Sequence, residues 1–232
     1  MTHAVHEINV YVEIGAKRTF AGALDWPGWC RQGRSEAEAL QALCDYGPRY
    51  AGVLRAAQIE FQPPADTITF AVVERLTGNA TTDFGAPDST PTSDHDPFTD
   101  ADLQRSQKLL QAYWQAFDNA VQAASGKTLR TGPRGGGRDL ERIVSHVLGA
   151  DVSYLTRLAW KHKPGNAEDL SEELGHTRQA ILRALAAAVR GEIPKQGPRG
   201  GAIWPPRFFV RRVAWHVLDH LWEIEQRAGP PG

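Results

Sequence analysis

The strongest constraint on the fold is a series of four long segments in the second half of the chain, in which apolar residues recur at spacings of three, four and seven. This spacing places the apolar side chains on one face of an α-helix, and that face must be buried against another element. Glycine and proline residues separate the segments, and Thr99 is a typical cap before the first. The pattern predicts a four-helix bundle. The expected helices span residues 99–121, 138–161, 167–190 and 208–224.

The first part of the chain has a different pattern. Apolar and polar residues alternate in its opening segment, and a second segment follows a Gly-Ala-Lys turn, which predicts a β-hairpin. Ser35 and Glu38 form a capping pattern at the start of a helix, which Gly47-Pro48 interrupts. We therefore expect a small α+β domain with an antiparallel sheet. Its expected strands lie at residues 7–14, 18–24 and 67–73.

Residues 77–97 are rich in glycine, threonine, aspartate and proline, as is typical of a linker. We therefore expect an α+β domain at residues 1–76, a linker at 77–97 and the helical bundle at 98–232. Four side chains of the linker allow two interpretations. They contact a metal ion or substrate if the linker folds back over the bundle, and otherwise they are solvated. They are Asp83, Asp94, His95 and Asp96.

The fourth expected helix contains two histidines, His216 and His220, which lie one turn apart on one face. An apolar stripe that includes Val213 and Val217 flanks this face on one side, and a polar stripe flanks it on the other. Two imidazoles at this spacing can bind one zinc, nickel, copper or iron ion without straining the helix. The alternative is that each histidine is a hydrogen-bonded core residue.

A third imidazole is available from the second expected helix, where His146 lies at the rim of the apolar face. The second and fourth helices of a bundle can be neighbours, so the three histidines could form a metal site with open coordination positions. The remaining helical histidines are not expected to contribute. His176 points away from the apolar stripe of its helix and should be solvated, and His162 should lie at the frayed end of the second helix.

Two stretches carry a resemblance to a known family. Ser145-His146-Val147-Leu148-Gly149-Ala150-Asp151, together with Val213-Ala214-Trp215-His216-Val217-Leu218-Asp219-His220, resembles the DinB/YfiT-like superfamily, over residues 98–228. The resemblance implies a DinB-like four-helix bundle that binds a divalent metal, zinc or nickel, through one histidine of the second helix and two of the fourth. Family members include thiol-dependent transferases and isomerases that use mycothiol, bacillithiol or glutathione.

The residues from Trp26 to Ala39 resemble the HicB-like antitoxin domain in their Pro-Gly turn, later glycine and capped helix. This resemblance covers residues 6–75 and implies a small α+β fold. The sequence departs from the antitoxin pattern, because its helix is broken at Pro48 and no ribbon-helix-helix or helix-turn-helix segment follows. A relationship of fold is therefore expected, without the antitoxin function.

Several further residues are candidates near the predicted metal site. Glu223, one turn after His220, either orients a histidine or is an exposed residue of the helix end. A Gly-Pro-Arg-Gly-Gly pentapeptide occurs before each histidine-bearing helix, with Arg134 in one copy and Arg199 in the other. These arginines either bind the carboxylates of a thiol cofactor or belong to flexible connections. Additional candidates for the same role are Arg138, Arg207 and Arg211.

Composition narrows the class of protein. The net charge of -1 disfavours a nucleic-acid partner that depends on broad phosphate attraction, and no apolar run is long enough to span a membrane. The chain starts without the pattern of a secretion signal, so we expect a cytoplasmic protein. Cys30 and Cys44 form no CxxC motif and indicate neither a disulfide framework nor a thiolate zinc site.

Two functions from different classes follow. The first is a metal-dependent enzyme that acts on a small-molecule substrate. This enzyme would be a thiol S-transferase, or have a related detoxifying activity, and would use a low-molecular-weight thiol as a cofactor. The N-terminal domain would then cover the site, form a homodimer or sense a ligand. The alternative is a non-catalytic regulatory or interaction protein that binds a partner through its HicB-like part and uses the bundle as a dimer scaffold.

Overall fold

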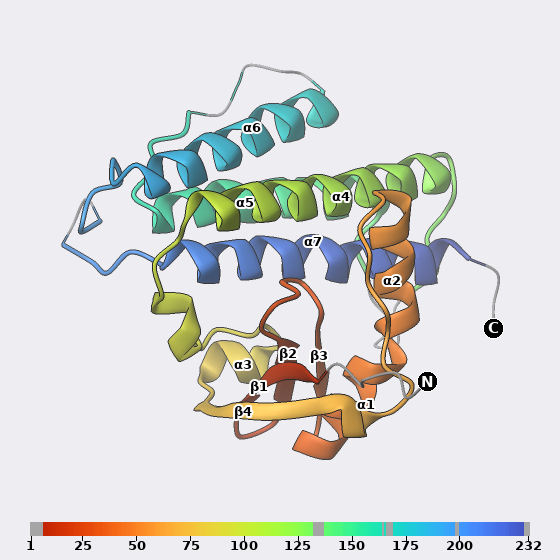
Figure 1. Cartoon of the computed structure of the whole chain (residues 1–232). Helices are drawn as coiled ribbons and strands as arrows, with labels where there is room; N and C mark the ends of the chain where they lie inside the picture. Colours follow the sequence, from red (N-terminus) through yellow and green to blue (C-terminus); the bar gives the residue numbers. More distant parts are fainter. Residues whose placement is uncertain (1–6, 132–136, 164, 166–168, 198–199, 230–232) are drawn as a thin grey trace. The chain divides into compact units, whose positions relative to one another are not determined.

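The computed structural model describes residues 7–131, 137–163, 165, 169–197 and 200–229. The chain divides into two compact units, Met1–Asp96 and Pro97–Gly232 (Figure 1). The first unit contains a four-stranded sheet and short helices, and the second contains four long helices. Each unit has its own core.

The sheet of the first unit is mixed, with the strand order β3-β2-β1-β4. β1 pairs antiparallel with β2, β2 pairs antiparallel with β3, and β4 pairs parallel with β1. The expected antiparallel sheet is therefore correct for only three of the strands. Two helices between β3 and β4 return the chain to the free edge of β1, so β4 runs in the same direction as β1. The strands are β1 (Ile8–Ile14), β2 (Thr19–Ala23), β3 (Cys30–Gly33) and β4 (Phe70–Thr77).

The helices of this unit begin and break near the positions that the sequence indicates. The Ser35 side chain accepts a hydrogen bond from the Glu38 amide at the start of α1 (Glu36–Asp45), and Tyr46 separates α1 from α2 (Gly47–Ala56). The core between helix and sheet centres on fully buried Trp29, whose indole nitrogen donates to the Leu43 carbonyl at 2.9 Å.

Residues 77–96 are not the free linker that their composition suggested. They contain α3 (Ala80–Phe84) and a short 3-10 turn at Thr92–His95, and they belong to the first unit. Fully buried Glu13 of β1 anchors this segment, because its carboxylate accepts hydrogen bonds from the Thr82 hydroxyl and from the amides of Asp88 and Ser89. The composition of a turn-rich segment does not distinguish a linker from a segment that a buried carboxylate holds in place.

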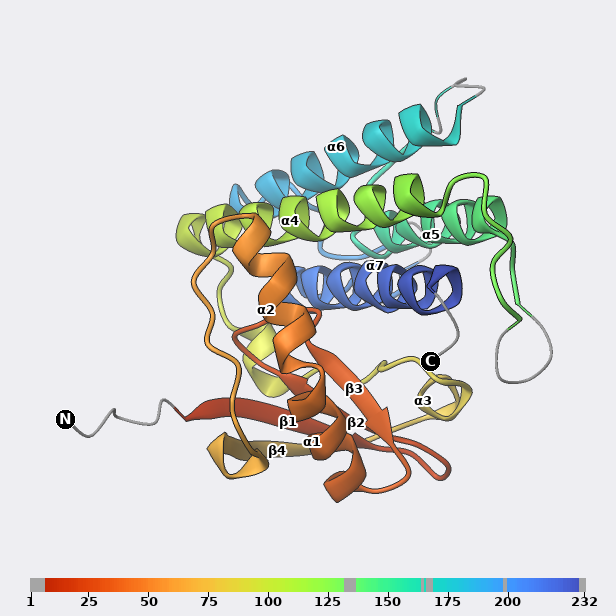
Figure 2. The same cartoon turned by 90° about the vertical axis from the view of Figure 1, so that its right-hand side faces the viewer.

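The second unit consists of α4 (Asp100–Ala124), α5 (Leu140–Arg157), α6 (Leu170–Val189) and α7 (Pro206–Ala228). Thr99 caps α4 in a capping box with Asp102, and the side chains of Asp139 and Asp169 cap α5 and α6. α7 packs mainly on α4 and α5, and α6 packs mainly on α5 (Figure 2). Within the described residues, no helix has both the length and the apolar character needed to cross a membrane.

Asp151 of α5 carries a buried carboxyl group. It is 1% exposed, and neither of its carboxyl oxygens has a hydrogen-bond partner among the described residues. Burial raises the pKa of this carboxyl from 3.8 to about 7, although the charge of Arg178 acts in the opposite direction. Arg178 itself is paired with Asp118 through two hydrogen bonds of 2.7 and 2.8 Å. Asp151 therefore enters the folded state most readily as the neutral acid.

We predict that Asp151→Asn stabilises the protein at alkaline pH. Between the ordinary carboxyl pKa and about 7, the unfolded chain has released a proton that the folded chain still holds, so stability falls as pH rises. The substitution should raise the free energy of unfolding at about pH 8 by roughly 1–3 kcal/mol, less than the ~4 kcal/mol that the full pKa shift represents. Urea unfolding at about pH 5 and about pH 8 measures this.

The matched control is Glu141→Gln, which removes an exposed carboxylate from the first turn of the same helix. It should leave the pH dependence of unfolding unchanged. If Asp151→Asn and the parent protein lose the same stability between the two pH values, ionisation of Asp151 does not oppose folding.

Candidate metal centre

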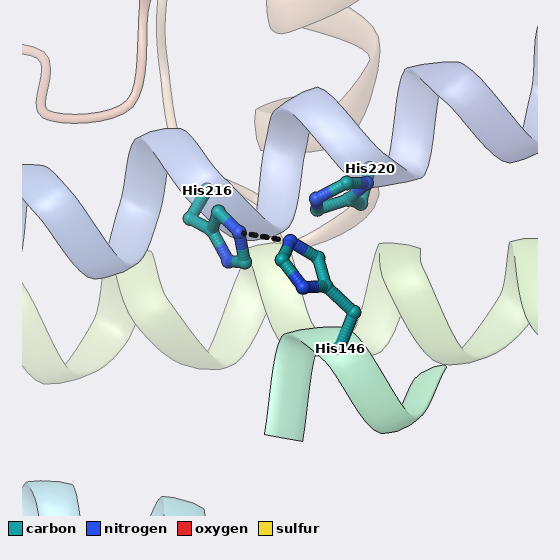
Figure 3. A group of neighbouring side chains, drawn as sticks. All are labelled: His146, His216 and His220. Atoms are coloured by element: carbon teal, nitrogen blue, oxygen red, sulfur yellow. Dashed lines mark hydrogen bonds between the residues drawn. The ribbon is translucent and has the colours of Figure 1, made fainter. Parts of the chain in front are cut away.

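Three histidines converge between α5 and α7. The ring centroids of His146 and His216 are 5.0 Å apart, those of His146 and His220 are 4.9 Å apart, and those of His216 and His220 are 4.6 Å apart. Figure 3 shows that the rings point toward one another, His146 from α5 and the other two from successive turns of α7. One nitrogen from each ring lies within 4.8 Å of the others, so the group could hold a metal ion. The three histidines named from the sequence are therefore brought together.

Helix packing creates this convergence. The four-residue spacing of His216 and His220 puts both rings on one face of α7, and the contact between α7 and α5 brings His146 to the same place. His216 and His220 are only 6% and 8% exposed, whereas His146 is half-buried. The site therefore has an enclosed side on α7 and a more open side on α5.

The Nε2 atoms of His146 and His216 are 3.2 Å apart, within hydrogen-bond distance of each other. Two ligands bound to one zinc ion at about 2.0–2.1 Å with tetrahedral angles lie roughly 3.3 Å apart. The observed separation is therefore compatible with a shared ion. The imidazole set also matches the chemistry of zinc and nickel, so the residues present fit such an ion.

The electrostatic surroundings favour neutral imidazoles. Burial lowers the pKa of His146 to about 4, and the nearby His220 and Arg138 act in the same direction. Burial also lowers the pKa of His216 well below its ordinary value, with further contributions from His220, His146, Arg212 and Arg138. Neutral imidazole is the form that binds a metal, so these two ligands need not lose a proton at neutral pH.

Glu223 orients one of the three rings. Its Oε2 atom lies 2.8 Å from His220 Nδ1, which leaves Nε2 as the remaining nitrogen of His220. Its Oε1 atom accepts a hydrogen bond of 2.6 Å from Arg227. The hydrogen bond with His220 is the main reason that the pKa of Glu223 is lowered. This carboxylate–imidazole arrangement fixes ring orientation at metal sites and makes the imidazole more basic.

Arg227 connects this carboxylate to the chain before α5. Its guanidinium donates to the carbonyls of Arg130 and Arg138 at 2.7 Å. Gly137 has a φ of 151°, and a Cβ at this position would lie 2.5 Å from Arg227 Nη2. Glycine therefore permits the close approach that holds Arg227, and through it Glu223, in place.

The arginines named from the sequence have different positions. Arg134 and Arg199 lie outside the described residues. Arg207 pairs with Asp102 at 2.7 Å near the start of α4, and Arg211 is buried in α7. Arg138 is close enough to the histidines for its charge to lower the pKa of His146 and of His216.

The sequence placed Arg212, one turn before His216, in the polar stripe beside the histidines but gave no role for it. Its guanidinium is 5.4, 6.0 and 5.2 Å from the rings of Tyr154, Trp204 and Trp215, and it donates to the Tyr154 hydroxyl at 3.3 Å. The Tyr154 ring is 5.8 Å from the ring of His216. The i−4 position relative to His216 was visible in the sequence, but the aromatic partners come from other segments.

A pocket of about 580 Å³ lies at the end of α5, where its lining includes Ser153, Thr156 and Ile203. Ser153 and Ile203 precede Tyr154 and Trp204, whose rings are 5.4 Å apart. The described lining of the pocket does not include His146, His216 or His220.

A second group that could hold a metal ion consists of His162, Glu173 and His176. His176 is exposed, as expected, but it lies beside His162 rather than in open solvent, with ring centroids 5.3 Å apart. Sequence reasoning treated the two histidines separately and did not consider Glu173. The i, i+3 spacing of Glu173 and His176 was the available signal.

Comparisons with protein-family models, with curated proteins and with solved structures found no match to this chain. The similarity to the DinB/YfiT-like superfamily and to the HicB-like domain therefore stays a prediction from the sequence.

We predict that Glu223→Gln weakens zinc binding by the three histidines without abolishing it. The amide cannot make the charge-assisted hydrogen bond to His220 Nδ1, and loss of such a partner typically costs about 10–100-fold in metal affinity. Competition with a chromophoric chelator measures the dissociation constant. Glu225→Gln, which removes an exposed carboxylate from the same helix, is the matched control. Equal affinities of the two variants would show that Glu223 does not tune this site.

Proposed function

We propose that the chain is a divalent-metal-dependent enzyme that transfers a low-molecular-weight thiol to an electrophilic small molecule. His146, His216 and His220 would hold the ion, zinc or nickel. The observation that carries this proposal is the convergence of three imidazoles from α5 and α7, with two Nε2 atoms 3.2 Å apart. Three protein ligands leave a coordination position for another molecule, as catalytic metal sites require.

The bound ion would lower the pKa of a coordinated thiol and hold it as the thiolate. Neutral imidazoles favour this role, because they leave the positive charge of the ion uncompensated. Arg138 and Arg212 add positive charge near the histidines and would attract a thiol cofactor that carries carboxylates. Glu223 would keep the His220 ring in position during the reaction.

The electrophile would lie against aromatic side chains. Tyr154 and Trp204 form a surface beside His216, and Arg212 contacts both rings. An apolar or planar electrophile on this surface would be near the thiol. The sulfur would form a bond to the electrophilic carbon, the leaving group would depart with its electron pair, and the thiol proton would pass to solvent.

We predict that His216→Ala removes one equivalent of metal per chain and the activity that depends on it. Protein purified without an affinity tag should be compared with the variant by elemental analysis. Both should then be assayed with monochlorobimane and mycothiol, bacillithiol or glutathione. The rate of the metal-replete protein should fall by about 100-fold or more in the variant, comparable to removal of a transition-state-stabilising group.

His95→Ala, which changes an exposed histidine of the first unit, is the matched control and should keep both metal and activity. Equal metal content in the parent protein and His216→Ala would contradict the metal site. Metal loss in His216→Ala without any thiol-dependent activity in the parent protein would contradict the transferase and favour the non-catalytic alternative.

A further inference from the structure

A second cluster of metal-binding side chains lies where the chain passes from α5 to α6. Glu173 and His176 are three residues apart near the start of α6, and His162 follows the end of α5. One ligand atom from each residue lies within 4.8 Å of the others. Two imidazoles and one carboxylate are a donor set that zinc uses in proteins.

The carboxylate of this cluster is buried and only partly satisfied. Glu173 is 7% exposed, and its Oε1 atom accepts a hydrogen bond of 2.7 Å from the Gly165 amide. The same atom lies 3.9 Å from Nδ1 of His176. Its Oε2 atom is buried and has no hydrogen-bond partner among the described residues. A buried carboxylate oxygen without a partner is costly, and a cation between the carboxylate and the imidazoles would offset that cost.

Gly165 leaves space beside the two ligands of α6. A Cβ at this position would lie 2.5 Å from Glu173 Oε2 and 3.6 Å from His176 Nδ1. Any side chain at residue 165 would therefore project toward the unsatisfied oxygen and the neighbouring imidazole. The same backbone donates its amide to the other oxygen of Glu173, so it approaches the carboxylate closely without filling the space beside it.

The third ligand is held by a neighbouring hydroxyl. Thr177 Oγ1 lies 3.2 Å from His162 Nε2, and this contact restrains the ring. Burial lowers the pKa of His162, and the charges of His176 and Arg183 act in the same direction, whereas Glu173 opposes them. The neutral imidazole that results retains a nitrogen lone pair for a metal ion.

We infer that His162, Glu173 and His176 bind a divalent transition-metal ion of the zinc or cobalt class, independently of His146, His216 and His220. Two imidazoles disfavour magnesium and calcium, which prefer oxygen ligands. The ion would link the residues that follow α5 to the first turns of α6. It would therefore stabilise this connection, whatever the reaction at the other site.

The test uses the full chain with His146→Ala and His216→Ala, so that the first site cannot contribute. Titration with Co²⁺, followed by its visible absorption and by equilibrium dialysis, should show one bound ion per chain. Glu173→Gln in this background should weaken Co²⁺ binding by more than about 100-fold. Removal of a direct ligand should lower metal affinity more than removal of a residue that only hydrogen-bonds to a ligand, which costs about 10–100-fold. Glu172→Gln, the adjacent exposed carboxylate, is the matched control and should bind normally.

Gly165→Ala provides a second test that retains every proposed ligand residue. Its methyl group would lie 2.5 Å from the present position of Glu173 Oε2 and displace that oxygen, so Co²⁺ binding should weaken while circular dichroism shows the parent helix content. Absence of Co²⁺ binding in the double-histidine background would overturn the inference, as would equal binding by Glu173→Gln and Glu172→Gln. Neither result depends on thiol transfer, so failure here is distinct from failure of the proposed function.

Discussion

The packing of α7 against α5 is the interaction on which the candidate centre depends. α7 is buried on most of its surface, including the apolar residues Phe209, Val213 and Val217, because α4 and α5 both pack on it. Burial of these side chains drives the association of the helices. It also brings His146 to the two histidines of α7 and excludes water from their enclosed side. The same contact thus creates the ligand geometry and lowers the histidine pKa values.

Three polar side chains of the centre are hydrogen-bonded in series, which offsets the cost of burying them. His220 has Glu223 as its partner, Glu223 has Arg227, and Arg227 has backbone carbonyls of the segment before α5. Each charged group is thereby paired or hydrogen-bonded, as buried charges require. His146 and His216 instead face each other, with no carboxylate between their Nε2 atoms. The two rings are within hydrogen-bond distance of each other, and with His220 they form a group that could hold a metal ion.

The two histidine clusters differ in how far sequence patterns could reveal them. His146, His216 and His220 lie within regular helices, where a periodicity of 3.6 residues gives the direction of each side chain. The second cluster depends on His162, which follows the end of α5, and on the backbone at Gly165. No periodicity governs such a segment. The angle of His176 on its helix correctly indicated exposure, but it could not reveal which residue lies beside it.

Local rules account for much of the fold. Hydrophobic periodicity and the Thr99 cap indicated the four helices of the second unit, and alternation indicated the first strands. These local patterns could not indicate the parallel pairing of β4, the attachment of residues 77–96 through Glu13, or the burial of Asp151.

The sequence by itself determined which residues form helices and which faces carry the histidines, because both depend on neighbours within a few positions along the chain. Only the tertiary structure decided that α5 meets α7 at the histidines, that Arg212 lies among aromatic rings, and that Glu173 is buried beside two imidazoles. These features arise from contacts between distant segments. Their free energy depends on packing and desolvation, and neither quantity is encoded in the spacing of residues along the chain.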